Sequence, residues 1–124
     1  MNNELLITDM CGRLQHHVMC EVSYKDSEGY KKDIMELKGY LPDSQFFFIT
    51  ENGGSIYSSD FKPYLRPMSS MTEEETDTYD RLVMSNAPWV VDDWLNAHHF
   101  DYRGLIEKGL ALEAPEDMYK VNNE

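Results

Sequence analysis

The sequence has few basic residues, and this scarcity argues against two classes of partner. Of 124 residues, 11 are lysine or arginine and 23 are aspartate or glutamate, which gives a formal charge of −12. Proteins that bind the backbone of a nucleic acid neutralise its phosphates with clustered lysine and arginine. Docking on an anionic membrane surface needs similar basic clusters. We therefore expect no direct binding to a nucleic-acid backbone and no binding to a membrane.

Long apolar runs and a basic leader are also missing. Apolar runs such as Phe46–Ile49 are far shorter than the roughly 20 residues that span a bilayer. The first residues, Met1–Asp9, lack the basic and apolar regions of a secretory signal. The expected location is the cytoplasm.

Cysteine is scarce, and the spacing of the cysteines and histidines does not favour metal binding. Cys11 and Cys20 fit neither a zinc pair nor a redox pair, so we expect two reduced, buried thiols. The histidines form two adjacent pairs, 16–17 and 98–99. Neighbouring side chains on a helix or strand point apart, so each pair offers at most one ligand to a shared metal. We expect one histidine of each pair to pack and the other to face water.

Signatures of catalysis are absent too. The sequence contains no Gly-x-Ser-x-Gly elbow, and its seven glycines form neither a P-loop nor a dinucleotide-binding pattern. A cysteine–histidine dyad is possible by composition, but no spacing supports it. The sequence therefore predicts a protein that is not an enzyme and has no cofactor.

What is present is the composition of one folded domain over residues 1–124. Hydrophobic residues make up 41% and charged residues 27% of the chain. Residues 1–67 are strand-rich and carry a net charge of −3, whereas residues 68–124 carry −9. We divide the second half into a helical part, 68–115, and a flexible polar tail, 116–124.

The first half predicts a short helix followed by a small sheet. Thr8 is the expected N-cap of a helix that runs to about Leu14. Alternating apolar residues and turn signals predict strands over residues 17–24, 31–40, 46–50, 55–57 and 61–66. Pro63 favours an edge position for the last strand. So few short strands favour a curled antiparallel sheet or a Src-homology-3-like barrel.

The second half predicts two to three helices, so the expected fold class is α+β. Thr72 and Glu75 form a capping box at the start of a helix that ends near residues 86–88. A second helix is expected over 91–98. A third is expected over 101–108, with Gly109 just after its last turn.

One candidate site is a small anion-binding site. Arg103 follows Tyr102 and Phe100, and stacking together with charge neutralisation would suit a nucleotide. Arg66 and Lys62 would complete the site. The competing interpretation is that the aromatic residues belong to the core and that Arg103 pairs with a nearby acid.

A second candidate site is an acidic surface for a partner. Its candidate residues are Glu73, Glu74, Asp77, Asp92 and Asp93. A dense row of carboxylates resembles a nucleic-acid backbone and suits a basic groove on another protein. The competing interpretation is a solvated acidic surface that only improves solubility.

Two segments carry a resemblance to a known group of proteins. Residues 94–115, Trp94 to Pro115, and residues 61–72, Phe61 to Thr72, resemble small proteins encoded by phages and prophages of gut Bacteroidales. The resemblance implies an accessory protein inside a bacterial host and carries over no catalytic residue. Small acidic proteins of such genomes often act by binding host defence enzymes or by sequestering signals.

Three hypotheses follow from the sequence. The first is a non-enzymatic phage protein that binds a host macromolecule and inhibits an anti-phage defence system. The second is a sponge for a nucleotide signal of host immunity, with its pocket at the interface of a homo-oligomer. The third is a metal-dependent hydrolase that uses His98 or His99.

Overall fold

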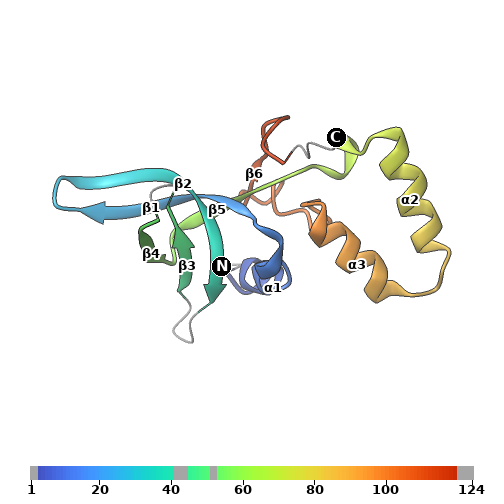
Figure 1. The fold of residues 1–124 in the computed structure, drawn as a ribbon, viewed down its shortest axis with the longest axis horizontal. Coiled ribbons are helices and arrows are strands. Elements are labelled where there is room, and N and C mark those ends of the chain that lie inside the picture. Colours follow the sequence, from blue (N-terminus) through green and yellow to red (C-terminus); the bar gives the residue numbers. More distant parts are fainter. Residues whose placement is uncertain (1–2, 41–44, 51–52, 120–124) are drawn as a thin grey trace.

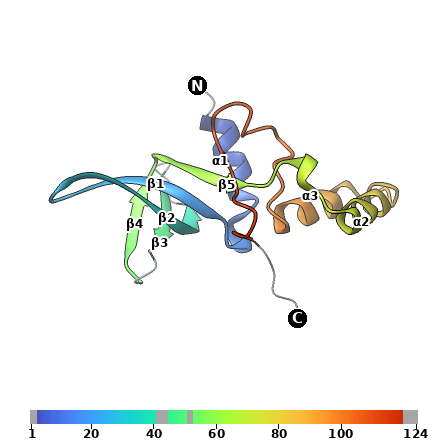
Figure 2. The same cartoon turned by 90° about the horizontal axis from the view of Figure 1, so that it is seen from above.

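The computed structural model describes residues 3–40, 45–50 and 53–119. The molecule is elongated, with a two-stranded arm at one end, a curved sheet in the middle and a pair of helices at the other end (Figures 1 and 2). The expected α+β class is confirmed, with three α-helices and one six-stranded sheet in the described chain.

The N-terminal helix is present but begins earlier than expected. Helix α1 spans Asn3–Cys11, so Thr8 lies inside it and is not its N-cap. Leu6 and Met10, four residues apart, lie on one face of the helix and are buried in the core. Burial of this apolar pair outweighs the capping preference of Thr8, whose side chain is exposed. A 3-10 turn, η1, follows over Leu14–His16.

The sheet has the order β4-β3-β2-β1-β5-β6. Its strands are β1 Met19–Asp26, β2 Gly29–Tyr40, β3 Phe46–Ile49, β4 Ser55–Ser58, β5 Phe61–Leu65 and β6 Leu112–Glu113. The first five pair antiparallel, whereas β6 pairs parallel to β5. The sheet is therefore mixed, because the parallel strand β6 adds to the antiparallel pairing of β1 to β5. This short C-terminal strand begins 47 positions after the end of β5.

The core lies on one side of the alternating strands. Val18, Cys20 and Val22 are fully buried, as the period-2 pattern predicted. The other strands contribute Met35, Leu37, Phe46, Phe48, Phe61 and Leu65 to the same core. Phe61 packs against two phenylalanine rings of β3 at centroid distances of 5.0 and 5.1 Å. This aromatic cluster fixes β3 and β5 around the strands between them.

A glycine and a proline lie within strands of the sheet, at positions that these residue types tolerate. The β2–β3 register shifts between Leu37 and Gly39, and a glycine within a strand often marks such an irregularity. Pro63 does not lie in an edge strand, because β5 has β1 on one side and β6 on the other. However, β6 pairs only with Tyr64 and Leu65. The missing N–H of Pro63 therefore costs no hydrogen bond between β5 and β6.

Two helices follow the sheet. Helix α2 spans Glu73–Val83 and has the expected capping box, in which Glu75 N–H donates to the Thr72 hydroxyl and the Glu75 carboxylate accepts from the Thr72 N–H. Helix α3 spans Pro88–Ala97, three residues earlier than its predicted start. Proline suits the first turn of a helix, where its missing N–H costs no hydrogen bond.

The third expected helix, over residues 101–108, is a series of turns instead. Gly104 has a φ of +73°, which interrupts a right-handed helix. Two local features of the prediction are nevertheless present. Asp101 accepts hydrogen bonds from the N–H groups of Leu105 and Ile106, and Gly109 ends the segment with a φ of +77°.

Part of the expected tail packs on the sheet. The Tyr119 hydroxyl accepts from Met19 N–H at 2.7 Å and donates to the Tyr64 carbonyl at 2.8 Å. Its ring stacks on His99 with a centroid distance of 3.7 Å. Residues 120–124 lie outside the described part of the chain.

Candidate partner-binding surface

The pair formed by α2 and α3, here called the helical hairpin (residues 73–97), is attached to the sheet through Arg66. This residue directly follows β5, and its guanidinium donates to both Glu75 carboxylate oxygens at 2.9 and 2.7 Å. The guanidinium also lies over the Phe100 ring, 4.2 Å from its centroid. The ion pair lowers the pKa of Glu75. Arg66 thus links β5, the first turn of α2 and the segment after α3.

The hairpin has only a thin apolar interior. Tyr79 of α2 meets Trp94 of α3 at a centroid distance of 6.2 Å, and Trp94 stacks on Phe100 at 5.8 Å. Helix α2 has no fully buried side chain, and α3 buries only Leu95 and Asn96. Both views show the hairpin extending away from the sheet (Figures 1 and 2). Most of its side chains therefore face solvent and are available to a partner.

All five predicted partner-binding carboxylates lie on this hairpin and are exposed: Glu73, Glu74, Asp77, Asp92 and Asp93. Residues 73–97 carry seven acidic side chains and one basic one, Arg81, for a net charge of −6. Half of the formal charge of the chain is therefore carried by this one structural unit.

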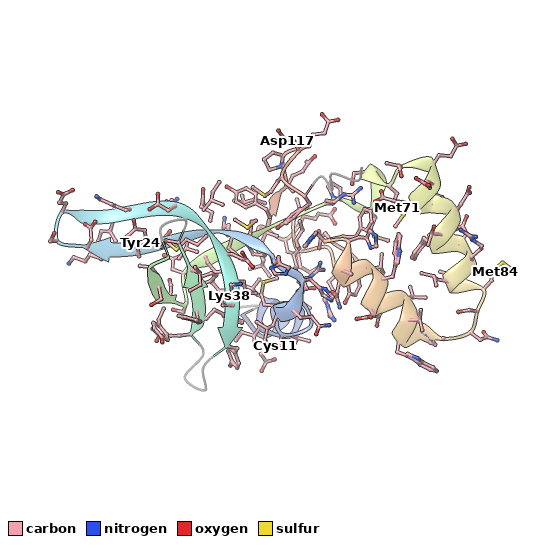
Figure 3. All side chains as sticks on the ribbon, viewed as in Figure 1. Cys11, Tyr24, Lys38, Met71, Met84 and Asp117 are labelled. Carbon is pink, nitrogen blue, oxygen red and sulfur yellow. The ribbon has the colours of Figure 1, made fainter. Side chains whose placement is uncertain are left out.

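The sequence interpretation missed four exposed apolar side chains on either side of the turn from α2 to α3. Val83, Met84, Trp89 and Val90, here called the apolar tip, are exposed by 50, 83, 72 and 38%. Met84 lies at the end of the hairpin far from the sheet (Figure 3). A sequence signal was available, because apolar residues flank the helix break at residues 86–88 on both sides. Side chains beside such a break have no neighbouring turn to cover them.

A small notch adjoins the apolar tip. Its volume is about 290 Å³, and it is lined by Val83, Asn86, Ala87, Pro88, Val91 and Asp92. This volume is close to the lower end of the range for small-molecule pockets, about 300 Å³. A space of this size can accept a side chain of a partner.

The predicted anion-binding residues do not form a free site. Arg103 donates to the buried Asp9 carboxylate at 3.2 Å and lies over the Tyr102 ring. Phe100 is fully buried, and Arg66 is held by Glu75. Lys62 is exposed on β5, opposite Glu21 of β1. The competing interpretation, with Phe100 in the core and Arg103 paired to an acid, is confirmed for these two residues.

Asp9 and Arg13 form a buried ion pair that the sequence interpretation did not identify. Both side chains are fully buried, and Arg13 donates to the two Asp9 oxygens at 2.8 and 3.0 Å. Arg13 also donates to the Phe100 carbonyl at 2.7 Å. The spacing i, i+4 in a helix was a usable signal. These contacts tie α1 to the segment that follows α3.

The cysteines and the first histidine pair follow the expectations only in part. Both cysteines are free, but Cys20 alone is buried, whereas Cys11 is exposed. Burial raises the pKa of the Cys20 thiol. In the first histidine pair, His17 faces solvent and His16 is partly buried, as expected.

The second histidine pair contacts two different aromatic residues. His98 stacks on Trp94, and His99 stacks on Tyr119, with both imidazoles partly buried. Burial lowers the pKa of His99 to about 3, and the nearby Arg13 cation adds to this effect. Among the described residues, no three histidine, cysteine or acidic side chains gather in a metal-binding group.

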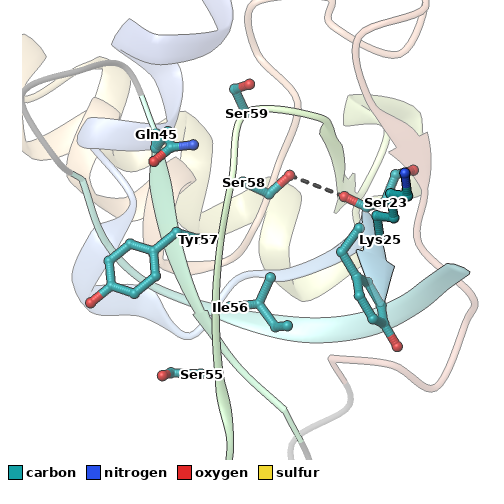
Figure 4. A pocket seen from close by; sticks show the side chains of 9 residues that line it. Ser23, Lys25, Gln45, Ser55, Ile56, Tyr57, Ser58 and Ser59 are labelled. Carbon is teal, nitrogen blue, oxygen red and sulfur yellow. Dashed lines mark hydrogen bonds between the residues drawn. The ribbon is translucent and has the colours of Figure 1, made fainter. Parts of the chain in front are cut away.

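A second groove lies at the opposite end of the molecule, beside β4. Its volume is about 480 Å³, and its walls are Ser23–Lys25 of β1, Gln45 and residues 55–59 of β4 and the following turn (Figure 4). The Ser58 hydroxyl donates to the Ser23 carbonyl at 3.1 Å and closes one end of the groove. Four of its nine lining residues are serines, and Lys25 is the one charged residue among the nine.

Comparison with protein-family models, with curated proteins and with solved structures found no match for this chain. In the described ranges, none of the helices has the length and apolar character needed to cross a membrane.

Proposed function

We propose that this protein is a non-enzymatic binding protein of a phage or prophage, which acts in the bacterial cytoplasm on a protein of its host. The observation that carries the proposal is the helical hairpin, which presents six exposed carboxylates and one exposed guanidinium, while its seventh carboxylate, Glu75, pairs with Arg66. Such a surface suits a basic groove on a partner. The resemblance of residues 61–72 and 94–115 to phage and prophage proteins supports the choice of host, and an anti-phage defence factor is the proposed class of target.

The attachment of the hairpin supports a binding role over simple solubility. A solubilising surface needs only scattered charges. Here a bidentate pair, partly shielded from solvent, orients α2 through Arg66 and Glu75. Pre-orientation of a surface reduces the entropy that is lost on binding. The acidic side chains are therefore held in a fixed arrangement relative to the sheet.

The proposal is tested with the full chain immobilised in a lysate of gut Bacteroidales. We expect one host protein to be retained in near-stoichiometric amount, as measured by quantitative mass spectrometry. Replacing Glu73, Glu74 and Asp77 with lysine should reduce its retention at least tenfold. A matched variant with lysine at the exposed positions Glu107, Glu113 and Glu116 changes the charge equally and should retain the partner. Absence of any stoichiometric host protein would contradict the proposal.

We also propose that the whole chain folds as one domain whose first five strands follow a Src-homology-3-like path. Support comes from β5, which returns to pair antiparallel with β1 after the β2–β3–β4 meander. The hydrogen bond from the Ser58 hydroxyl to the Ser23 carbonyl joins the end of β4 to β1, although two strands separate them in the order of the sheet. Nuclear Overhauser contacts between these two serines in solution would test this arrangement.

A further inference from the structure

We infer that the apolar tip is the anchor of the partner interface, and that its occupant is a protein surface with an apolar recess bordered by lysine and arginine. This inference rests on the proposed function and names the site and the partner chemistry. Trp89 and Met84, exposed by 72 and 83%, are the largest apolar side chains of the tip. The four tip residues lie within eight positions of the chain, on either side of one turn, and exposed apolar surface concentrated in one region marks interaction sites more often than isolated residues do.

Trp89 has the properties of an interface hot spot. Tryptophan is enriched among the few residues that carry most of the binding energy. It lies in the first turn of α3, directly after Pro88, so the helix start fixes its backbone direction. A large side chain on a rigid element loses little entropy when it enters a recess.

The notch beside the tip provides the complementary feature. Its six lining residues come from both sides of the helix break, and Val83 belongs to the notch as well as to the tip. A partner side chain in the notch and Trp89 in a partner recess would interlock the two surfaces. Interlocking of this kind is typical of specific interfaces, in which anchors of the two partners lie together.

The charges around the tip specify the border of the partner's recess. Asp92 and Asp93 follow Trp89 by three and four positions in α3, so they lie on the same side of the helix, and the Asp93 carboxylate also lies 3.9 Å from the His16 Nε2 atom. Asp92 also lines the notch. The hairpin carries a single basic residue, Arg81. Opposing lysine and arginine would therefore match the tip, and opposing carboxylates would be repelled.

The same charges disfavour three other occupants. In a symmetric dimer through the tip, the same patch of each copy would meet, which brings the exposed carboxylates of two hairpins together. A nucleic acid or an anionic membrane would meet the same repulsion. A basic-bordered protein surface is the occupant that the apolar and the acidic features favour together.

The test uses the full chain with a photoreactive amino acid at position 84, incubated in Bacteroidales lysate and analysed by cross-linking mass spectrometry. We expect cross-links to one host protein, in a segment where apolar residues are flanked by lysine or arginine. Trp89→Ala should lower the yield at least tenfold with an unchanged unfolding midpoint. Asp92→Asn with Asp93→Asn should weaken binding, and less so at high salt. The control is Tyr30→Ala, which removes an aromatic side chain exposed by 83% at the tip of the β1–β2 arm.

The outcomes separate this inference from the proposed function. Retention of a host protein that is unaffected by Trp89→Ala, with no cross-link from position 84, would overturn the inference and leave the proposed function intact. Cross-links between two copies of the chain, or to nucleic acid, would also overturn it. Failure of the unmodified chain to retain any host protein would overturn both.

Discussion

Arg66 and Glu75 connect the sheet to the helical hairpin by two charge-assisted hydrogen bonds of 2.9 and 2.7 Å. The same carboxylate also accepts the Thr72 N–H, so Glu75 has both a tertiary and a local role. A single side chain therefore determines where α2 begins and how it is oriented.

Replacing Glu75 with glutamine should loosen the hairpin without unfolding the sheet. The change removes the ion pair and weakens the capping box, with an expected cost of about 1–2 kcal/mol. Hydrogen exchange should accelerate in residues 73–83 and stay unchanged in β1 and β2. Glu74→Gln is the matched control, because the Glu74 side chain is exposed one position earlier in the same turn. Equal exchange rates in both variants would contradict this role of Glu75.

Replacing Arg13 with methionine should be strongly destabilising. The variant leaves Asp9 buried without its main partner, and loss of one member of a buried pair costs about 3–5 kcal/mol. The double variant Asp9→Leu with Arg13→Met should recover much of this loss, because it removes both charges of the fully buried pair, and Arg103, which also donates to Asp9, is partly exposed. Urea unfolding measures both, and if Arg13→Met is insoluble, recovery of soluble protein in the double variant tests the same point. A loss below 1 kcal/mol in the single variant would show that the pair is unimportant.

Stability should decrease as the pH falls from 7.5 to 5.5, partly because of His99. Its folded-state pKa of about 3 lies far below the ordinary value of 6.5. The unfolded chain therefore binds a proton in this window that the folded chain does not bind, which costs the folded state about 1 kcal/mol by pH 5.5. The folded state therefore keeps its full stability, as far as His99 is concerned, above pH 6.5. This contribution is lost progressively as the pH falls toward 3.

The variant His99→Asn isolates this effect. Position 99 has a φ of +65°, which asparagine tolerates better than most residues. The other histidines are present in both proteins, so the difference between the two pH slopes reports the replacement of His99. Free energies of unfolding at pH 7.5 and 5.5 give these slopes, and identical slopes would rule out the burial effect.

Removing the Tyr119 hydroxyl should weaken the attachment of the C-terminal segment. Tyr119→Phe keeps the ring that stacks on His99 but leaves the Met19 N–H and the Tyr64 carbonyl without this partner. The expected loss is about 1–2 kcal/mol in thermal or urea unfolding. Tyr30→Phe, at an exposed position, should leave stability unchanged. A Tyr119→Phe protein as stable as this control would show that water replaces the hydroxyl at no cost.

Local signals in the sequence predicted the local structure well. The Thr72–Glu75 capping box and the buried face of β1 depend on spacings of two or three residues, and both are present. The partners that are distant in sequence were not predictable. Arg103 and Asp9 are 94 residues apart, and only the folded chain shows that Arg103 pairs with a buried acid. A basic residue beside aromatic residues has the same sequence pattern whether it binds a ligand or an internal carboxylate.

The candidate surface was predictable in its charge but not in its apolar tip. Exposed carboxylates follow from composition, since acids are rarely buried without a partner. The exposure of Trp89 depends on α3 beginning at Pro88 and on no other described element covering the helix break, which is a matter of tertiary arrangement. The turns over residues 101–108 show the same limit, because the positive φ of Gly104 overrides a helix-compatible pattern.

Helix α2 has no fully buried side chain, so substitutions on most of its surface leave the core of the fold intact. Surface changes away from such contacts typically alter stability by less than about 0.5 kcal/mol. The sequence of α2 can therefore change at most of its positions while the sheet keeps its shape. If the proposed target changes its surface, substitutions on α2 can restore the fit without unfolding the sheet.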